Sequence, residues 1–330
     1  MKVGVTGAAG FVGSHVCEQL LEKDYEVVGV DDLSYGAVPN IAPFLDHSGF
    51  QLEVFDCAHQ RELRRAFAGC DAIIHTAAKK IPRFGGTYST LHVNTKGMES
   101  ACAVALSLDA DLIFTSTSDV YGDGTPPYSE DGELVIGPPT TKRWAYAVSK
   151  MYDEHYGLAL ADERDLRVTI LRLFNAYGSR NHLSWWGGPV VTFIEALLDG
   201  EPMEIHGDGQ QTRTFTHVYD TAAGIVRALE RPQSRGEVIN LGGTETVTIL
   251  ELASRIQVEL GLPAEPLRAN FVPYESLPGK YQDVRHRIPD TAKAERVLEF
   301  VPRMTLAEGL RETVGWHQAI REAGGTAAGA

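Results

Sequence analysis

A tyrosine and a lysine stand four residues apart in the segment Tyr146-Ala147-Val148-Ser149-Lys150. Residues at this spacing share one face of a helix. An unperturbed phenol has a pKa near ~10 and is a poor base at neutral pH. A neighbouring positive charge favours its phenolate and brings it into a working range. The pair is therefore a candidate to remove a proton from a substrate alcohol.

A hydroxyl-rich stretch lies upstream of this pair, at Thr115-Ser116-Thr117-Ser118-Asp119-Val120-Tyr121-Gly122. It begins at the end of a strand that we expect at residues 111–116. A hydroxyl from Thr117 or Ser118 would hold the substrate alcohol while Tyr146 takes its proton. Asp119 is the third candidate catalytic residue of the stretch.

Three glycines follow the first expected strand, in Gly7-Ala8-Ala9-Gly10-Phe11-Val12-Gly13. Glycine at such positions permits a tight turn, a close approach of backbone N–H groups to a pyrophosphate, and close packing of helix on strand. The positive end of the helix adds to the attraction for phosphate. We therefore predict a dinucleotide site at Gly7, Gly10, Phe11, Val12 and Gly13.

The second expected strand, 26–30, ends on Asp31, with Asp32 beside it. An acidic residue at this distance from the glycine turn accepts hydrogen bonds from ribose hydroxyls and repels a 2′-phosphate. The predicted cofactor is NAD, whose positive nicotinamide ring would join Lys150 in favouring the phenolate, and whose ribose Lys150 would bond. Asp56 either bonds the adenine amine or caps the helix expected from residue 59.

The first half of the chain alternates short β-branched runs with amphipathic stretches, which predicts an α/β fold with a doubly wound parallel sheet of the Rossmann type. We expect strands at 2–6, 26–30, 51–54, 72–75, 111–116 and 167–173, and helices at 13–23, 59–67, 91–107 and 146–163. Residues 1–175 would form the NAD-binding domain. Residues 176–330, where loop chemistry dominates, would form mainly a smaller, discontinuous α/β substrate lobe. A returning segment near 214–245 holds a strand-like run, 237–240, that would rejoin the first sheet.

The composition limits the class of protein. The 330 residues are 43% hydrophobic and 22% charged, as in an ordinary globular protein. A net charge of -14 argues against nucleic-acid partners. No run approaches the ~20 apolar residues of a membrane helix, and the first residues enter a strand directly, so we expect no signal peptide and no membrane partner. Four scattered cysteines indicate reduced thiols in the cytoplasm and neither a disulfide framework nor a metal site: Cys17, Cys57, Cys70 and Cys102.

Taken together, these motifs resemble the extended short-chain dehydrogenase/reductase family, in its nucleotide-sugar epimerase/dehydratase/decarboxylase branch, over nearly the whole chain. Further residues carry the resemblance: His75-Thr76-Ala77-Ala78, Val93-Asn94, Arg172-Leu173-Phe174-Asn175-Ala176-Tyr177-Gly178, His206-Gly207-Asp208-Gly209-Gln210-Gln211-Thr212-Arg213 and Asn240-Leu241-Gly242-Gly243. The resemblance implies that Ala77, Ala78 and Asn94 contact NAD, and that Asn175 and Arg213 contact a sugar-nucleotide diphosphate. It further implies oxidation of the sugar at carbon 4, and a homodimer formed through the helices expected at 91–107 and 146–163.

Two features are similar to UDP-glucuronate decarboxylases in particular. Arg143 lies three residues before Tyr146, where it could hold a uronic carboxylate, and Ser118-Asp119 resembles the Ser-Glu pair of those enzymes. Asp119 is one methylene shorter than Glu, which leaves 4-epimerisation of UDP-glucose or a UDP-uronate open. A 4,6-dehydratase is less expected, because the Asp-Glu pair of that group is absent here. Arg143 could alternatively be a solvated residue beside the helix start.

Several side chains are compatible with more than one role. Trp185 and Trp186 could stack on a uracil or sugar ring, or fill the interface between the lobes. Arg213 could be a surface ion pair, and His75 and His217 are expected to be packed or capping residues. A non-catalytic NAD-binding protein on the same fold, or an alcohol dehydrogenase that releases NADH, would share the cofactor motifs.

Overall fold

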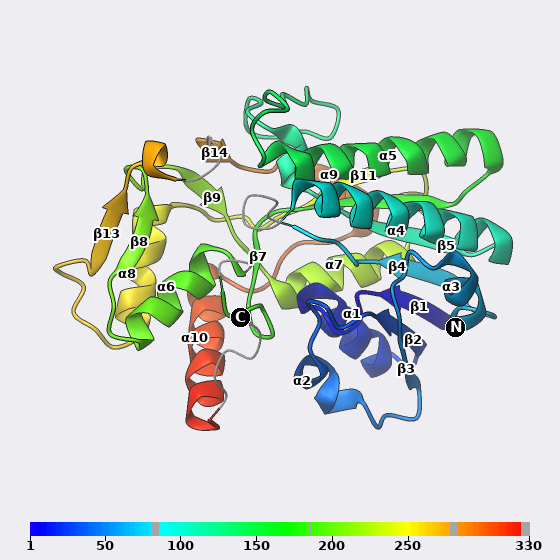
Figure 1. The fold of residues 1–330 in the computed structure, drawn as a ribbon, viewed down its shortest axis with the longest axis horizontal. Coiled ribbons are helices and arrows are strands. Elements are labelled where there is room, and N and C mark those ends of the chain that lie inside the picture. Colours follow the sequence, from blue (N-terminus) through cyan, green and yellow to red (C-terminus); the bar gives the residue numbers. More distant parts are fainter. Residues whose placement is uncertain (81–85, 185–186, 278–282, 325–330) are drawn as a thin grey trace.

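The computed structural model describes residues 1–80, 86–184, 187–277 and 283–324. Seven parallel strands form the central sheet, in the order β11-β6-β5-β4-β1-β2-β3 (Figure 1). The predicted strands are confirmed to within one residue at either end, and the returning strand joins the sheet beside β6. The strand bounds are β1 (Lys2–Thr6), β2 (Glu26–Asp31), β3 (Phe50–Val54), β4 (Ala72–His75), β5 (Asp111–Thr117), β6 (Val168–Leu173) and β11 (Val238–Leu241).

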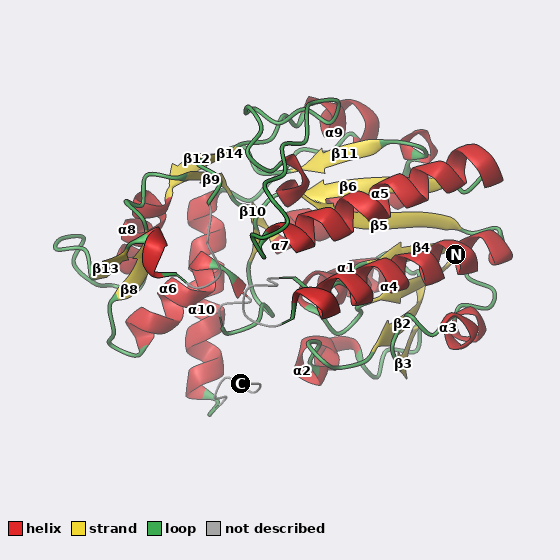
Figure 2. Cartoon of the chain, turned by 45° about the horizontal axis from the view of Figure 1, so that its top comes forward, coloured by secondary structure: helices red, strands yellow, loops and turns green. Residues whose placement is uncertain are grey.

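Helices cover both faces of this sheet, and the central strands are apolar on both sides for that reason. One face packs against α1, α2, α7 and α9 through a core that includes Val16, Leu20 and Ile225. The other packs against α3, α4 and α5, and Figure 2 shows α4 and α5 side by side along it. The helix bounds are α1 (Phe11–Glu22), α2 (Val38–Ile41), α3 (Gln60–Ala66), α4 (Thr87–Leu108), α5 (Trp144–Arg164), α7 (Val218–Glu230) and α9 (Ala292–Leu298).

The remaining elements form a smaller assembly on the left of Figure 1, around a core of its own that includes Ile194, Leu252 and Leu310. In three small sheets, β9 pairs with both β12 and β14, β13 pairs with β8, and β10 pairs with β7. The bounds are β7 (Ala176–Tyr177), α6 (Pro189–Leu198), β8 (Met203–His206), β9 (Thr212–Thr214), β10 (Thr216–His217), β12 (Thr246–Thr248), α8 (Ile249–Glu259), β13 (Ala269–Val272), β14 (His286–Arg287) and α10 (Leu306–Glu322).

The expectation that loop chemistry dominates from residue 176 was wrong for the helices. α6, α7, α8 and α10 all lie in this region. Two of them carry start signals in the sequence, since Thr248 with Glu251 and Thr305 with Glu308 form capping boxes at the starts of α8 and α10. The short strands between them obscured the helical periodicity.

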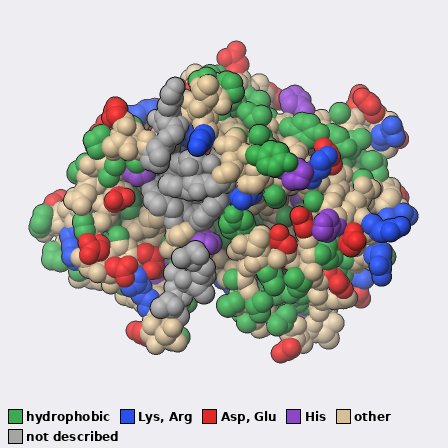
Figure 3. Space-filling view, in the orientation of Figure 1, with side chains coloured by type: hydrophobic (Ala, Val, Ile, Leu, Met, Phe, Trp, Pro, Cys, Tyr) green, Lys and Arg blue, Asp and Glu red, His purple; other side chains and the backbone are tan. Residues whose placement is uncertain are grey.

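Acidic and basic side chains are interspersed over the face drawn in Figure 3, so that face has no large area of one sign. In the described part of the chain no helix is long and apolar enough to cross a membrane. All four cysteines are buried and free.

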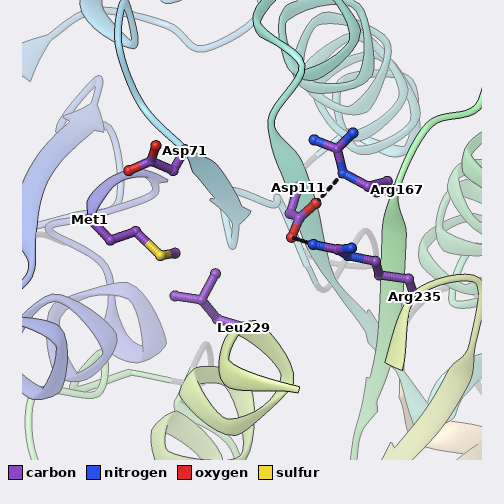
Figure 4. A pocket seen from close by; sticks show the side chains of 6 residues that line it. All are labelled: Met1, Asp71, Asp111, Arg167, Leu229 and Arg235. Atoms are coloured by element: carbon purple, nitrogen blue, oxygen red, sulfur yellow. Dashed lines mark hydrogen bonds and ion pairs between the residues drawn. The ribbon is translucent and has the colours of Figure 1, made fainter. Parts of the chain in front are cut away.

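A recess opens at the amino ends of the central strands (Figure 4), lined by Met1, Asp71, Asp111, Arg167, Leu229 and Arg235. Asp111 lies 2.5 Å from Arg167 and 2.6 Å from Arg235. These charges neutralise one another, and ligands of open parallel sheets bind at the opposite, carboxyl ends of the strands. We therefore assign these ion pairs to the stability of the strand starts.

Candidate active site

The carboxyl ends of the central strands bring the predicted cofactor and catalytic residues to one edge of the sheet. The glycine turn follows β1, Asp31 ends β2, and Thr117 ends β5. The strand order reverses between β1 and β4, which is where open parallel sheets bind their ligands.

The glycine positions of the turn leave no room for a side chain. Gly7 has a φ of +72°, and a Cβ on Gly13 would lie 2.0 Å from the Gly7 carbonyl oxygen. α1 begins at Phe11, and its N-cap, Gly10, provides no side-chain hydrogen bond to the first helical N–H groups. Those groups remain available to a ligand, so the turn fits the pyrophosphate of a dinucleotide.

Asp31 lies beside this turn. Its Oδ2 accepts a hydrogen bond from Ala9 N at 2.9 Å and its Oδ1 accepts one from Leu33 N at 2.9 Å. Each oxygen retains acceptor capacity for a ribose hydroxyl. A Cβ on Gly36 would lie 2.5 Å from Oδ1, so glycine at that position keeps the approach to the carboxylate open. Burial raises the pKa of Asp31, and the backbone hydrogen bonds oppose that effect.

The two other acidic candidates of the cofactor site have local partners. Asp32 Oδ1 accepts from Ser34 N at 2.9 Å and from Ser34 Oγ at 2.6 Å. Asp56 Oδ1 accepts from Ala58 N at 2.9 Å, whereas the N-cap of α3 is His59. The alternative in which Asp56 caps that helix is therefore wrong, because it caps the turn that precedes it.

The loop after β4 is held by Asn94 of α4. Asn94 Oδ1 accepts from Lys79 N at 2.7 Å, and Asn94 Nδ2 donates to Lys79 O at 3.2 Å and to Ser149 Oγ at 2.9 Å. These bonds use both amide hydrogens of the side chain. Asn94 thus fixes the loop that carries Ala77 and Ala78 and ties it to α5.

Tyr146 lies in the first turn of α5, and a side-chain hydrogen bond joins it to Thr117 at the end of β5. Thr117 Oγ1 also accepts from Asp119 N at 3.2 Å. Ser118 follows, fully within the interior. Burial raises the pKa of Tyr146, and the Asp119 carboxylate raises it further. The protein alone therefore holds a neutral phenol, so the expected lowering of this pKa needs charge that the bound cofactor would add.

Lys150 is almost fully buried, with 1% of its surface exposed. Its Nζ lies 4.4 Å from the centre of the Phe114 ring and 3.9 Å from Asp153 Oδ2. Among the described residues it makes no hydrogen bond. A buried ammonium with unused donors fits a ligand that supplies hydroxyl acceptors, such as the ribose of a nicotinamide nucleotide.

Three arginines and two aspartates meet above the end of β5, and we call this group the arginine cluster: Arg143, Arg213, Arg287, Asp119 and Asp283. Asp119 Oδ1 lies 3.2 Å from Arg143 and 2.6 Å from Arg287. Asp283 Oδ1 lies 2.8 Å from Arg213 and 3.2 Å from Arg143.

Both carboxylates of the cluster are held ionised. Burial acts to raise the pKa of Asp119, but Arg287 and Arg143 outweigh it and the pKa is lowered. The pKa of Asp283 falls from 3.8 to about 2, because its arginine neighbours outweigh burial. Three guanidiniums against two carboxylates leave a positive excess inside a chain of net charge -14. This excess favours an anionic ligand.

The arginine cluster contains two arginines predicted from the sequence, Arg143 and Arg213, and two residues that were not predicted, Arg287 and Asp283. Arg143 and Arg213 have only 13% and 9% of their side chains exposed, so neither is a solvated residue or a surface ion pair. The sequence signal for Arg287 and Asp283 is the alternation of charged and other residues in Asp283-Val284-Arg285-His286-Arg287. The short strand β14 lies within this segment and aligns Arg287 with Arg213 of β9.

The other residues singled out in the sequence are not members of the arginine cluster. Asn175 adopts a φ of +40° and donates from Nδ2 to Thr214 O at 2.9 Å. His75 is buried and His217 is the N-cap of α7, as predicted. Trp185 and Trp186 lie outside the described residues. Over residues 1–80, 86–184, 187–277 and 283–324, no group of three or more His, Cys, Asp or Glu is placed to hold a metal ion.

Two known decarboxylases are similar to this chain over nearly its whole length. A UDP-N-acetyl-alpha-D-glucosaminuronate decarboxylase from Bacillus cytotoxicus is 32% identical over 320 residues, covering 96% of this chain and 97% of that protein. UDP-glucuronic acid decarboxylase 1 from Danio rerio is 33% identical over 319 residues, covering 95% of this chain and 72% of that protein.

A solved structure with similar architecture is the UDP-glucuronic acid 4-epimerase from Bacillus cereus, in complex with UDP-glucuronic acid and NAD. It superposes with a TM-score of 0.84 at 30% identity, covering 97% of this chain and all of that one. Residues 3–242 match the family described as the NAD dependent epimerase/dehydratase family. Because that match spans most of the chain and includes the glycine turn, Asp31, Tyr146 and Lys150, this protein is a member of the NAD dependent epimerase/dehydratase family.

Proposed function

We propose that this protein is an NAD-dependent decarboxylase of a UDP-linked uronic acid, either UDP-glucuronate or its 2-acetamido counterpart. The observation that carries the proposal is the arginine cluster, which holds a positive excess next to Tyr146 and Thr117. A UDP-uronate presents a diphosphate and a carboxylate, so it matches this excess at two points. The two decarboxylase relatives support the same substrate class.

We assign the cofactor contacts to the sheet edge. Bound NAD supplies the chemistry of accepting a hydride from carbon 4 and returning it. Gly7, Gly10, Phe11, Val12 and Gly13 would hold its pyrophosphate, and Asp31 its adenosine ribose. Asp32, Asp56, Ala77 and Ala78 line the same edge, while Asn94 keeps the loop after β4 in place.

In the substrate part of the site, Thr117 orients the carbon-4 hydroxyl and Tyr146 takes its proton. Oxidation at carbon 4 makes the sugar a β-keto acid, whose carbon 5–carbon 6 bond breaks with loss of carbon dioxide. The electron pair passes to the carbon-4 ketone as an enolate, and carbon 5 then takes up a proton. Arg143 would bind the carboxylate in place of Asp119, while Arg213 and Asn175 would hold the diphosphate.

The wider assignments are also proposals. We propose that residues 1–175, with the segment near 214–245, bind NAD and that 176–330 mainly hold the sugar nucleotide. We propose a homodimer through α4 and α5, because Tyr88, Val148 and Tyr152 are exposed on those helices. Four free, buried cysteines suit a reducing compartment, and we place the enzyme in the cytoplasm.

A second candidate is 4-epimerisation of the same UDP-uronate. The observation in its favour is that Asp119 engages both Arg143 and Arg287, which leaves Arg143 less able to hold a carboxylate. The solved 4-epimerase from Bacillus cereus supports that alternative as well. The two reactions share the oxidation at carbon 4 and differ in whether the carboxylate is lost.

Liquid chromatography coupled to mass spectrometry of the products distinguishes them, because chromatography separates a 4-epimer that has the same mass as the substrate. The purified protein is incubated with NAD⁺ and, separately, UDP-glucuronate and UDP-N-acetylglucosaminuronate, with Tyr146→Phe as the inactive control. Decarboxylation gives a product lighter by one carbon dioxide, and Arg143→Ala is expected to abolish it. A new isomer of unchanged mass would establish the epimerase, and an unchanged substrate would overturn both uronate assignments.

A further inference from the structure

Asp153 lies one helical turn after Lys150 on α5 and has no exposed surface. Its Oδ2 is 3.9 Å from Lys150 Nζ, which is an ion-pair distance and too long for a hydrogen bond. Among the described residues, neither carboxylate oxygen has a hydrogen-bond partner, and neither has the ammonium. A buried carboxylate without hydrogen bonds is costly. Neither the cofactor motif nor the hydroxyl cluster accounts for it.

Several titratable groups from α5, α4, β4 and the segment after β3 face this pair: Tyr146, Tyr152 and Glu154 on α5, Glu99 and Cys102 on α4, His75 on β4, and Cys57 after β3. Burial lowers the pKa of His75 to about 3, so His75 is neutral. Of the groups named here, Lys150 is therefore the one cation at neutral pH.

Each member of the pair counteracts the effect of burial on the pKa of the other. Burial lowers the pKa of Lys150, and Asp153 provides the largest opposing effect. Burial raises the pKa of Asp153 to about 7, although Lys150 opposes that effect, so the carboxylate is charged mainly above neutral pH. Phe114 packs against the ammonium and offers no hydrogen-bond acceptor, so a lysine in this position without Asp153 would lose its proton more readily.

We propose that Asp153 is a positioning residue that keeps Lys150 protonated in its buried position as the pH rises above neutral. The ammonium form matters because it carries three N–H donors and a positive charge, whereas the neutral amine has no charge to offer a phenolate. Asp153 acts only through Lys150. The inference rests on the proposed function, in which Lys150 binds NAD and favours the Tyr146 phenolate. Its test measures the affinity for NAD and needs no substrate.

The test compares the wild type with Asp153→Asn, which removes the charge and keeps the shape. The matched control is Asp162→Asn, on the exposed side of the same helix. The affinity for NAD is measured by calorimetry from pH 6 to pH 10. In the wild type and the control, binding weakens only at the alkaline end, where Lys150 loses its proton. In D153N the midpoint of this loss is expected at least about one pH unit lower.

A merely structural role gives a different pattern. If D153N weakens binding equally at every pH with an unmoved midpoint, the proposal is overturned. If the wild type binds no NAD at any pH, the assigned cofactor role fails instead, so the two failures are distinguishable.

A stability cycle provides a second test should D153N fail to fold. Lys150→Met leaves the carboxylate buried without its cation, and adding Asp153→Asn removes that charge too. The double variant K150M/D153N is expected to regain the thermal stability that K150M loses. No recovery would contradict the pairing.

Discussion

Replacing Asp283 by asparagine tests the arginine cluster as a stabilising ion-pair network. Its Oδ1 pairs with Arg213 and Arg143, and its pKa falls from 3.8 to about 2. Because only 11% of the Asp283 side chain is exposed, solvent screening weakens its interaction with the arginines only slightly. The fall corresponds to about 2 kcal/mol of folding free energy. D283N is therefore expected to unfold with a free energy about 2 kcal/mol lower than the wild type at neutral pH.

The sign of the pH dependence follows from the direction of the shift. A carboxyl whose pKa is depressed in the folded state contributes stability above its ordinary pKa of 3.8, and that contribution is lost as the pH falls through about 2. Urea unfolding at pH 5 and pH 7 should therefore give the same difference between D283N and wild type. The control is Asp208→Asn in an exposed pair with Arg285, expected to leave stability unchanged. Equal stability of D283N and wild type would refute the ion-pair reasoning.

Three further variants probe separate parts of the site. Gly13→Ala places a Cβ 2.0 Å from the Gly7 carbonyl oxygen and should abolish NAD binding by calorimetry, whereas retained binding would contradict the glycine-turn assignment. Glu154→Gln leaves Arg172 buried beside a neutral partner and should lower the free energy of unfolding by about 3–5 kcal/mol, and a loss below about 1 kcal/mol would show that the pair is not needed. Asp31→Asn removes the charge that repels a 2′-phosphate, so the preference for NAD over NADP should fall by about tenfold in competitive binding. An unchanged preference would place the discrimination elsewhere.

The central sheet was predictable from sequence because its signals are local. Buried parallel strands form short runs rich in β-branched and other apolar residues, and β1, β2, β5 and β6 all show such runs. The glycine turn and the Tyr146–Lys150 pair depend on fixed spacings within one strand–helix unit. Such features can be predicted without knowledge of the tertiary structure.

The arginine cluster was only partly predictable because it is assembled from distant segments. Arg143 and Arg213 lie in motifs, but Asp283 and Arg287 reach them from a region with short strands and weak periodicity. The direction of the Tyr146 pKa also depended on tertiary structure, since burial and Asp119 raise it. The role of Asp153 likewise needed a structure, because its complete burial cannot be read from spacing.

A single-turnover experiment tests the central claim, which is oxidation of a UDP-uronate at carbon 4. The protein, loaded with NAD⁺ and in excess over UDP-glucuronate or UDP-N-acetylglucosaminuronate, is followed by the near-ultraviolet absorbance of reduced nicotinamide. The absorbance is expected to rise and then decay as a product lighter by one carbon dioxide forms, and Tyr146→Phe is expected to show no rise. Product formation with no dependence on Tyr146, or no absorbance change with either uronate, would contradict the central claim.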